Sequence, residues 1–219
     1  MAPALTWDKT GDRLYETGVD HGVLYIPTAG EYTAGYAWNG LTAITEAPSG
    51  AEASPIYADN IKYLSLTSAE EFGGTIEAYT YPEEFGQCDG TAEPGAGVLI
   101  GQQARKSFGL CYRTLLGNDT EGQDHGFKLH LVYGAQAAPS EKAYSTVNDS
   151  PEATTFSWEF TTSPVNVTGK KPTSILTIDS TKVDAEGLED LLAILYGSEA
   201  TPARMPLPDE IITLLTPTP

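Results

Sequence analysis

Few residues of this chain have the types and spacing that catalytic or ligand chemistry requires. The histidines are His21, His125 and His130, and the cysteines are Cys88 and Cys111. No H-E-x-x-H helix, C-x-x-C pair, G-x-S-x-G turn or phosphate-binding glycine loop is present. A glycosidase-like carboxylate pair is the one arrangement left open, because it depends on separation in space. We therefore expect no catalysis and no cofactor.

One segment near the middle of the chain gathers oxygen-bearing side chains. Asn118, Asp119, Glu121 and Asp124 all lie within residues 117–126. Such a group could suggest a Ca²⁺ site, but its spacing does not match the EF-hand pattern. We predict an ordinary solvated turn and no bound metal.

Net charge is the strongest global feature of the sequence. The chain has 12 basic and 30 acidic side chains, which gives a net charge of −18. A DNA-binding module is disfavoured, because affinity for a phosphate backbone normally comes from Lys and Arg. The charge fits either a soluble acidic surface or a surface that lets DNA pass without holding it.

Cysteine usage and hydropathy indicate the compartment. Two cysteines are too few to staple 219 residues, so we expect both to be reduced, as in a cytosol. The N-terminal segment lacks a basic region followed by an apolar run, and so predicts no signal peptide. No run of ~18 apolar residues occurs, which argues against a membrane span.

The elements that would position these residues are expected to be mostly strands of one domain. The 22 glycines and 15 prolines favour many short strands and turns over a helical bundle. Phe127–Tyr133 alternates apolar and polar residues, which predicts a strand with one buried and one wet face, His130 lying on the wet face. Phe156, Trp158 and Phe160 alternate in the same way and are expected in the core.

Glycine and proline predict where the chain turns. Residues 63–81 are interpreted as a hairpin whose turn is Gly73-Gly74, and Pro82 ends its second strand because proline has no N–H for the ladder. Upstream, the apolar phase changes at Asn39-Gly40, where we predict a β-bulge.

Two segments are predicted to lie outside the sheet. Residues 46–55 are mainly Ala, Pro, Ser, Gly and Glu, which neither pair nor pack, so we expect a long contact loop. After an N-cap at Asp184, leucines at helical spacing predict one packed helix that Gly197 ends. The Pro-rich residues 198–219, with a short predicted helix at 209–215, should be disordered or dock on a neighbouring subunit.

Three segments carry a resemblance to a known family. In order, they are SAEEFGGTIEAYTYPEEFGQCDG at 68–90, KSFGLCYRTLLGND at 106–119 and FKLHLVYGAQAAPSEKAYSTVNDSPEATTFSWEFTTSPV at 127–165. As an ordered set they resemble the tail tube (major tail) proteins of long-tailed bacteriophages of Gram-positive hosts.

The resemblance implies a mostly β, sandwich or barrel-like tail tube fold with one packed α-helix, a long inter-strand loop and terminal arms. It divides the chain into an N-terminal arm (1–20), a β domain with its C-terminal helix (21–197) and the Pro-rich tail (198–219). Strands lining the tube would lie near residues 33–45, 56–66, 107–114 and 126–134.

The resemblance also implies a structural protein of the virion rather than an enzyme. Hexameric rings would assemble in the host cytoplasm and stack into the tail tube. DNA and the tape measure protein would pass along its acidic lumen, the DNA without specific binding. Tail terminator and distal tail proteins would be the other partners, and no membrane would be involved.

Two groups of residues would make the implied contacts. The long loop would reach a neighbouring subunit through Glu46, Ala47, Pro48, Ser49, Gly50, Ala51, Glu52 and Pro55. Residues facing the lumen would include Asn39, Asp59, Lys128 and His130, of which the last two depart from a purely acidic lining.

A different function class fits some of the same features. A β-sandwich binding module, such as a carbohydrate-binding or capsid decoration protein, would account for exposed tyrosines and for the acidic charge. It would not account for an insert, an N-terminal arm and a Pro-rich tail in one chain. A remote enzyme is the second alternative.

Overall fold

Eight antiparallel strands build the main sheet of this protein, so the predicted mostly β fold is confirmed. The computed structural model describes residues 4–147, 149–150, 152–199 and 201–216. Along the sheet the strand order is β2-β1-β11-β12-β13-β8-β3, and β14 pairs with β12. The bounds are β1 (Tyr15–Thr28), β2 (Glu31–Trp38), β3 (Leu41–Glu46), β8 (Gly73–Ala78), β11 (Phe108–Asn118), β12 (Gly122–Ala137), β13 (Phe156–Thr162) and β14 (Ile175–Asp179).

The sheet curls until its two end strands come close. β2 and β3 stand at opposite ends of the strand order, yet only Asn39 and Gly40 separate them along the chain. Gly40 takes φ +75°, which favours glycine, and its carbonyl accepts a hydrogen bond from the Tyr79 N–H at 2.8 Å. The predicted β-bulge is therefore wrong: the phase change marks a corner between two sheet edges, and the fold is barrel-like.

The inside of the curl holds the first of two apolar cores, which we call the inner core. Its large aromatic members include Trp38, Phe85, Phe108, Trp158 and Phe160, each at most 3% exposed. The rings of Phe85 and Trp158 meet edge to face with centroids 5.1 Å apart. Burial of such a ring contributes roughly 2–3 kcal/mol, and the predicted core role of the β13 aromatics is confirmed.

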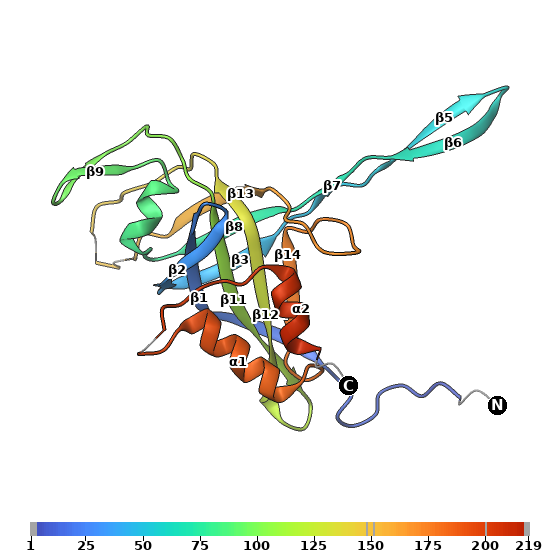
Figure 1. Cartoon of the computed structure of the whole chain (residues 1–219). Helices are drawn as coiled ribbons and strands as arrows, with labels where there is room; N and C mark the ends of the chain where they lie inside the picture. Colours follow the sequence, from blue (N-terminus) through green and yellow to red (C-terminus); the bar gives the residue numbers. More distant parts are fainter. Residues whose placement is uncertain (1–3, 148, 151, 200, 217–219) are drawn as a thin grey trace.

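Two helices cover the outer face of the sheet, as Figure 1 shows. In α1 (Ala185–Tyr196), Leu188, Leu191 and Leu195 form a helix-side core with α2 (Pro208–Leu215) and β12. The Asp184 side chain caps α1 by accepting from the Gly187 N–H at 2.9 Å, and Gly197 ends it. The predicted helix is confirmed at both ends.

The central strand β12 is buried on both faces over its second half. Leu131 and Tyr133 face the helix-side core, Val132 faces the inner core, and His130 is only 7% exposed. The predicted wet face is therefore wrong at His130, because side chains from other strands of the sheet cover it.

The C-terminal segment packs on its own chain. Met205 and Ile211 belong to the helix-side core, and the Met205 N–H donates to the Tyr32 carbonyl at 3.0 Å. Pro208 starts α2, because a proline in the first helical turn needs no N–H partner. The predicted disordered or neighbour-docked tail is wrong for residues 201–216, whereas its short helix is present. Residues 217–219 lie outside the described residues.

The N-terminal arm is shorter than predicted. β1 starts at Tyr15, which pairs with Gly117 of β11, so residues 15–20 belong to the main sheet. Residues 4–14 remain as an extended segment with exposed Leu5 and Trp7. The first three residues of the predicted arm lie outside the described part of the chain.

Candidate functional site

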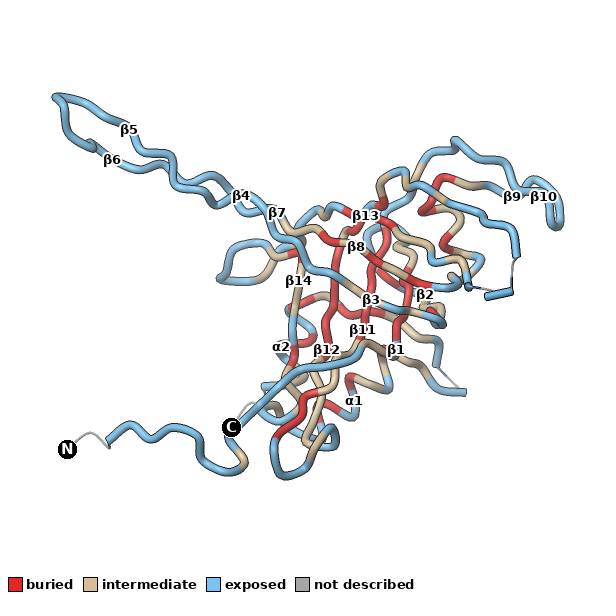
Figure 2. Tube along the Cα trace, turned by 180° about the vertical axis from the view of Figure 1, so that it is seen from behind, coloured by how far each residue is buried: buried red, intermediate tan, exposed pale blue. Residues whose placement is uncertain are grey.

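A long β-hairpin, which we call the arm (residues 47–72), projects from the body between β3 and β8. Figures 1 and 2 show it extending well beyond the sheet. Next to the body, β4 (Ser49–Gly50) pairs with β7 (Glu70–Glu71); farther out, β5 (Ala53–Ala58) pairs with β6 (Ile61–Thr67). All residues of these four strands are exposed (Figure 2). At its base, Phe72 packs against Phe160 and its carbonyl accepts a hydrogen bond from Thr162 at 2.6 Å. Beyond this base, the four exposed strands of the arm pair only with one another.

The tip of the arm explains why this segment forms a hairpin. Asp59 and Asn60 have φ values of 49° and 64°, in the left-handed region that these two residue types tolerate best after glycine. Two consecutive residues of this kind make the tight turn that matches the twist of paired strands, and they join Ala58 to Ile61. The resemblance-based assignment of 56–66 to one strand is wrong, because the turn divides it.

The predicted hairpin at Gly73-Gly74 is also wrong. Both glycines lie inside β8, where a side chain on Gly74 would place its Cβ 2.3 Å from the Thr45 carbonyl oxygen of β3. Close strand approach, not turn geometry, accounts for glycine here.

The segment predicted as an unpaired contact loop is one strand of the arm. Glu46 ends β3, the Ala47 N–H donates to the Gly73 carbonyl at 2.8 Å, and Ser49 pairs with Glu71. Its predicted lack of pairing is wrong, because β6 and β7 supply the missing partners. Its predicted contact with a neighbouring subunit stays a prediction.

A change of register gives the arm one apolar face. Ser54 and Ile56 of β5 pair with Leu66 and Leu64 of β6, and beyond a shift in register Ala58 pairs with Ile61. Directly paired residues point to the same side of a hairpin, so Ile56, Ile61, Leu64 and Leu66 share one face. The opposite face carries Ala53, Pro55, Tyr57, Lys62, Ser65 and Thr67. Tyr63 has no direct partner at the register shift and is 66% exposed.

The apolar face lies open to solvent. Ile61 is 63% exposed and Leu66 is 57% exposed. An isolated two-stranded hairpin is marginally stable in water, and contiguous exposed apolar surface usually marks a site of protein contact. We therefore identify the apolar face of the arm as the candidate functional site.

The root of the arm is held by a polar cluster inside the sheet. Glu46 Oε1 accepts a hydrogen bond from the Tyr112 hydroxyl at 2.6 Å and lies 3.2 Å from His130 Nδ1. The Tyr112 and His130 rings stack with centroids 4.7 Å apart, and His130 Nε2 lies 3.0 Å from Thr114 Oγ1. These contacts join the last residue before the arm to two central strands.

Burial sets the protonation state of this cluster. It lowers the pKa of His130 and outweighs the attraction of the Glu46 carboxylate, and it raises the pKa of Tyr112 with help from the hydrogen bond to Glu46. His130 is therefore neutral at pH 7, and Glu46 holds the root by hydrogen bonding and not through a buried ion pair.

The four residues predicted to face the lumen do not gather on one surface. Asp59 forms the tip of the arm, Asn39 forms the corner between β2 and β3, and His130 is buried at the arm's root. Lys128 makes an ion pair with Glu16 on the sheet, so its charge is locally offset. The burial of His130 speaks against its lining a lumen, whereas the assignment of Asn39, Asp59 and Lys128 to the lumen stays a prediction. Alternation along separate strands cannot say which strands share a surface.

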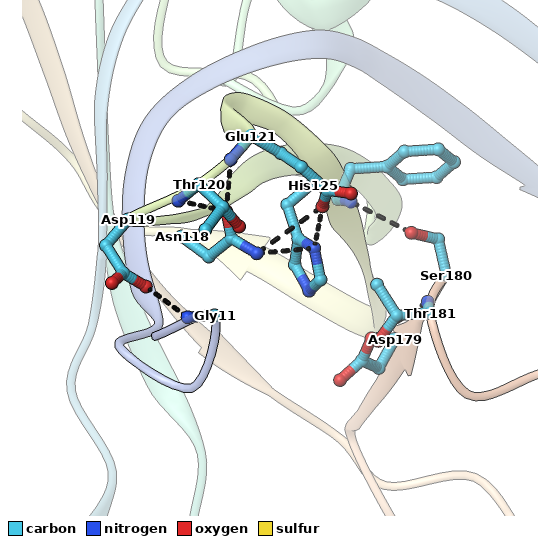
Figure 3. A network of polar contacts seen from close by, with 10 residues as sticks. Gly11, Asn118, Asp119, Thr120, Glu121, His125, Asp179, Ser180 and Thr181 are labelled. Carbon is cyan, nitrogen blue, oxygen red and sulfur yellow. Dashed lines mark hydrogen bonds and ion pairs between the residues drawn. The ribbon is translucent and has the colours of Figure 1, made fainter. Parts of the chain in front are cut away.

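The acidic turn between β11 and β12 is held by hydrogen bonds among its own residues and to Gly11 (Figure 3). Asn118 Oδ1 accepts from the N–H groups of Thr120 and Glu121 at 3.0 and 2.6 Å, and Asp119 accepts from the Gly11 N–H at 2.9 Å. The ordinary turn predicted here is confirmed, and it also fixes the N-terminal segment. Within the described residues, no group of His, Cys, Asp and Glu side chains is placed to hold a metal ion.

An ion pair between Arg113 and Asp20 lies on the helix side of the sheet. Arg113 donates to both carboxylate oxygens of Asp20 at 2.7 Å, and this bond is the main cause that lowers the pKa of Asp20. It ties β1 to β11 at a register shift of their pairing, and so has a structural role.

Both cysteines are free and buried, and burial raises the pKa of each to about 12, so neither is a reactive thiolate.

Sequence reasoning missed the residues that make the arm's apolar face. A signal was present: Asp59-Asn60 stands between two alternating segments, which is typical of a two-residue hairpin turn.

A scan against protein-family models finds no match, and a search of curated proteins also finds none. Across the described residues, no helix has the length and apolar content needed to cross a membrane.

Proposed function

We propose that this protein is the self-assembling subunit of a bacteriophage tail tube, in which stacked hexameric rings form an acidic conduit for DNA. The arm is the observation that carries the proposal. Its apolar residues are uncovered in the single chain, and a second copy of the chain would bury them. The resemblance of three ordered segments to tail tube proteins supports the same function.

Two further features support a ring-forming subunit. The end strand β3, and the end strand β2 away from its bridge between Tyr32 and Met205, offer edges where a neighbouring subunit could add hydrogen bonds. Edge pairing is a common route to assembly. With a net charge of −18, a lumen built from such chains would repel DNA and let it slide. In this role the tape measure, tail terminator and distal tail proteins are the partners, and the virion is the destination.

Removing the whole arm tests this proposal. Residues 49–71 are replaced by a short glycine-rich turn, so that no strand loses its partner and Glu46 and Gly74 stay paired. The truncated protein should keep its circular dichroism spectrum and remain a monomer in sedimentation velocity at concentrations where the full chain forms large assemblies. Equal assembly by both proteins would overturn the role of the arm. A monomeric full chain that binds glycans would favour a binding module.

A further inference from the structure

A groove lies on the side of the body away from the arm. It lies between the 3₁₀-helix η1 (Glu83–Gln87) and the small hairpin of β9 (Ala92–Gly95) and β10 (Val98–Ile100), and its volume is about 660 Å³. Tyr81 and Leu99 supply apolar walls, and Glu83, Glu84 and Glu93 outnumber Lys106. The groove thus combines apolar surface with net negative charge.

The β9–β10 hairpin, which forms one wall of the groove, is held by a side-chain hydrogen bond and is exposed to solvent. Glu93 Oε1 accepts from the Gly97 N–H at 2.6 Å, which fixes the turn between β9 and β10. Val98, Leu99 and Ile100 of β10 are 57%, 65% and 43% exposed. Of these, Leu99 lines the groove together with the carboxylates, and its neighbours lie on the other face of the strand. Contiguous exposed apolar surface with a polar rim is typical of a protein contact.

A basic turn lies on the opposite side of the body, in the loop between β13 and β14. Lys170 and Lys171 are both exposed, and neither has an ion-pair partner among the residues that the structure describes. Backbone hydrogen bonds between Val165 and Thr173 close the loop, and Asp209 of α2 accepts two hydrogen bonds from Thr168. The turn is therefore presented on a fixed base.

Figures 1 and 2 place this loop and the β9–β10 hairpin on opposite flanks of the sheet, in two views that differ by half a turn. Two different patches on opposite flanks make a head-to-tail contact, which is the kind that generates rings. Copies with a net charge of −18 repel one another, so lateral contact needs a place where opposite charges meet.

We propose that the Lys170-Lys171 turn of one copy docks in the acidic groove of the next copy and so sets the lateral order of subunits in a ring. The inference rests on the proposed tube function. It names a contact between neighbouring subunits of one ring, in addition to the contact that the apolar face of the arm makes with the next subunit. Lys170 and Lys171 meet Glu83 and Glu84, and the apolar strand β10 packs against the loop around them.

Charge reversal tests the contact directly. K170E/K171E and E83K/E84K are each made in the full chain, and so is the quadruple variant that carries both changes. Assembly is followed by light scattering and sedimentation velocity over a range of protein concentrations. Each double variant should need a roughly tenfold higher concentration to assemble, as expected when two exposed charge pairs become repulsive. The quadruple variant should assemble like the wild type.

Mixing provides a second readout. Equal amounts of the two double variants should assemble together, because each offers the surface that the other lost, and alternating rings close only with an even number of copies. A change in net charge cannot explain these results, because K170E/K171E makes the chain more negative and E83K/E84K makes it less negative. This contact alone would be overturned if the double variants assembled like the wild type. It would also be overturned if neither the quadruple variant nor the mixture assembled while the wild type forms tubes. A wild type that stays monomeric would overturn the tube proposal as well.

Discussion

His130 is a titratable residue whose surroundings differ strongly from those of an exposed side chain, since it is only 7% exposed. It lies between Glu46 of β3, Tyr112 and Thr114 of β11, and Lys128 of its own strand. Burial lowers its pKa in the folded state, whereas the unfolded chain restores an ordinary value of about 6.5. Below that value the unfolded state binds more protons than the folded state, so stability falls as the pH falls.

The first prediction concerns this pH dependence. His130→Gln keeps a polar side chain beside Thr114 but removes the titrating group. Between about pH 7.5 and about pH 5.5, the wild type should lose more unfolding free energy than the variant does. Urea unfolding at both pH values measures the difference. Equal losses in the two proteins would show that His130 is not held neutral by burial.

Residue-level chemistry was only partly predictable from the sequence. The cap at Asp184, the stop at Gly197 and the solvated turn at residues 117–126 depend on near neighbours along the chain, and these predictions are confirmed. The burial of His130 was not predictable, because its cover comes from Glu46 and Tyr112, which lie 84 and 18 residues away. Alternation in one strand cannot report what lies above it.

Among the elements, the arm is the one whose exposed surface most needs a partner. Its apolar face depends on the register shift between Ile56 and Tyr57, since without it Lys62 would stand on the same side as Leu64. A bulge that re-aims side chains in this way is typical of functional positions.

The second prediction uses paired substitutions on the two faces of the arm. Ile56→Ser with Leu64→Ser removes one cross-strand pair from the apolar face, and Tyr57→Ser with Lys62→Ser removes the adjacent pair from the other face. Neither change should alter the melting temperature of the monomer by more than a few degrees, because these side chains are exposed. The first should abolish assembly in sedimentation velocity, and the second should weaken it less. The reverse order would contradict the assigned contact face.

The C-terminal helix α2 is the second element that the structure places differently from the sequence prediction. Local rules identified a short helix, but they could not show that Ile211 packs into the core of the same chain. The strand pairs of the arm were missed for the same reason, since pairing is a property of two segments. The sequence could predict the helices and several strands, but not which segments pair, and the turns at Gly73-Gly74 and Asp59-Asn60 were misassigned for the same reason.

The third prediction distinguishes the two faces of α2. Ile211 is 1% exposed and Ile212 is 43% exposed. Ile211→Ala should lower the unfolding free energy of the monomer by about 2–4 kcal/mol, because it leaves a cavity in the helix-side core. Ile212→Ala should cost less than about 1 kcal/mol. If both substitutions had equal effects in urea unfolding, α2 would not be docked on its own sheet.

At the scale of the whole molecule, one barrel-like body carries several uncovered surfaces on different sides. These are the apolar face of the arm, the groove beside β10, the basic turn between β13 and β14 and the edges of β2 and β3. A subunit that meets neighbours beside, above and below it would use each of them.

The fourth prediction follows from the charge of the assembled protein. Screening reduces repulsion between copies with a net charge of −18, and it also weakens contacts between exposed opposite charges. Assembly through the apolar arm should therefore survive about 0.5 M NaCl, whereas DNA should show no salt-dependent binding at any ionic strength. Light scattering measures the first effect and fluorescence anisotropy with labelled duplex the second. Tight, salt-sensitive DNA binding would contradict a conduit that lets DNA pass.

Electron microscopy of the purified protein shows directly whether this chain assembles into tubes through its arm. Wild-type protein is concentrated and imaged in negative stain beside the arm-truncated variant. The wild type should form straight, hollow tubes with six-fold symmetry in end views, and the truncated variant should show separate small particles. Wild-type images that show only single small particles at every concentration would contradict assembly into tubes.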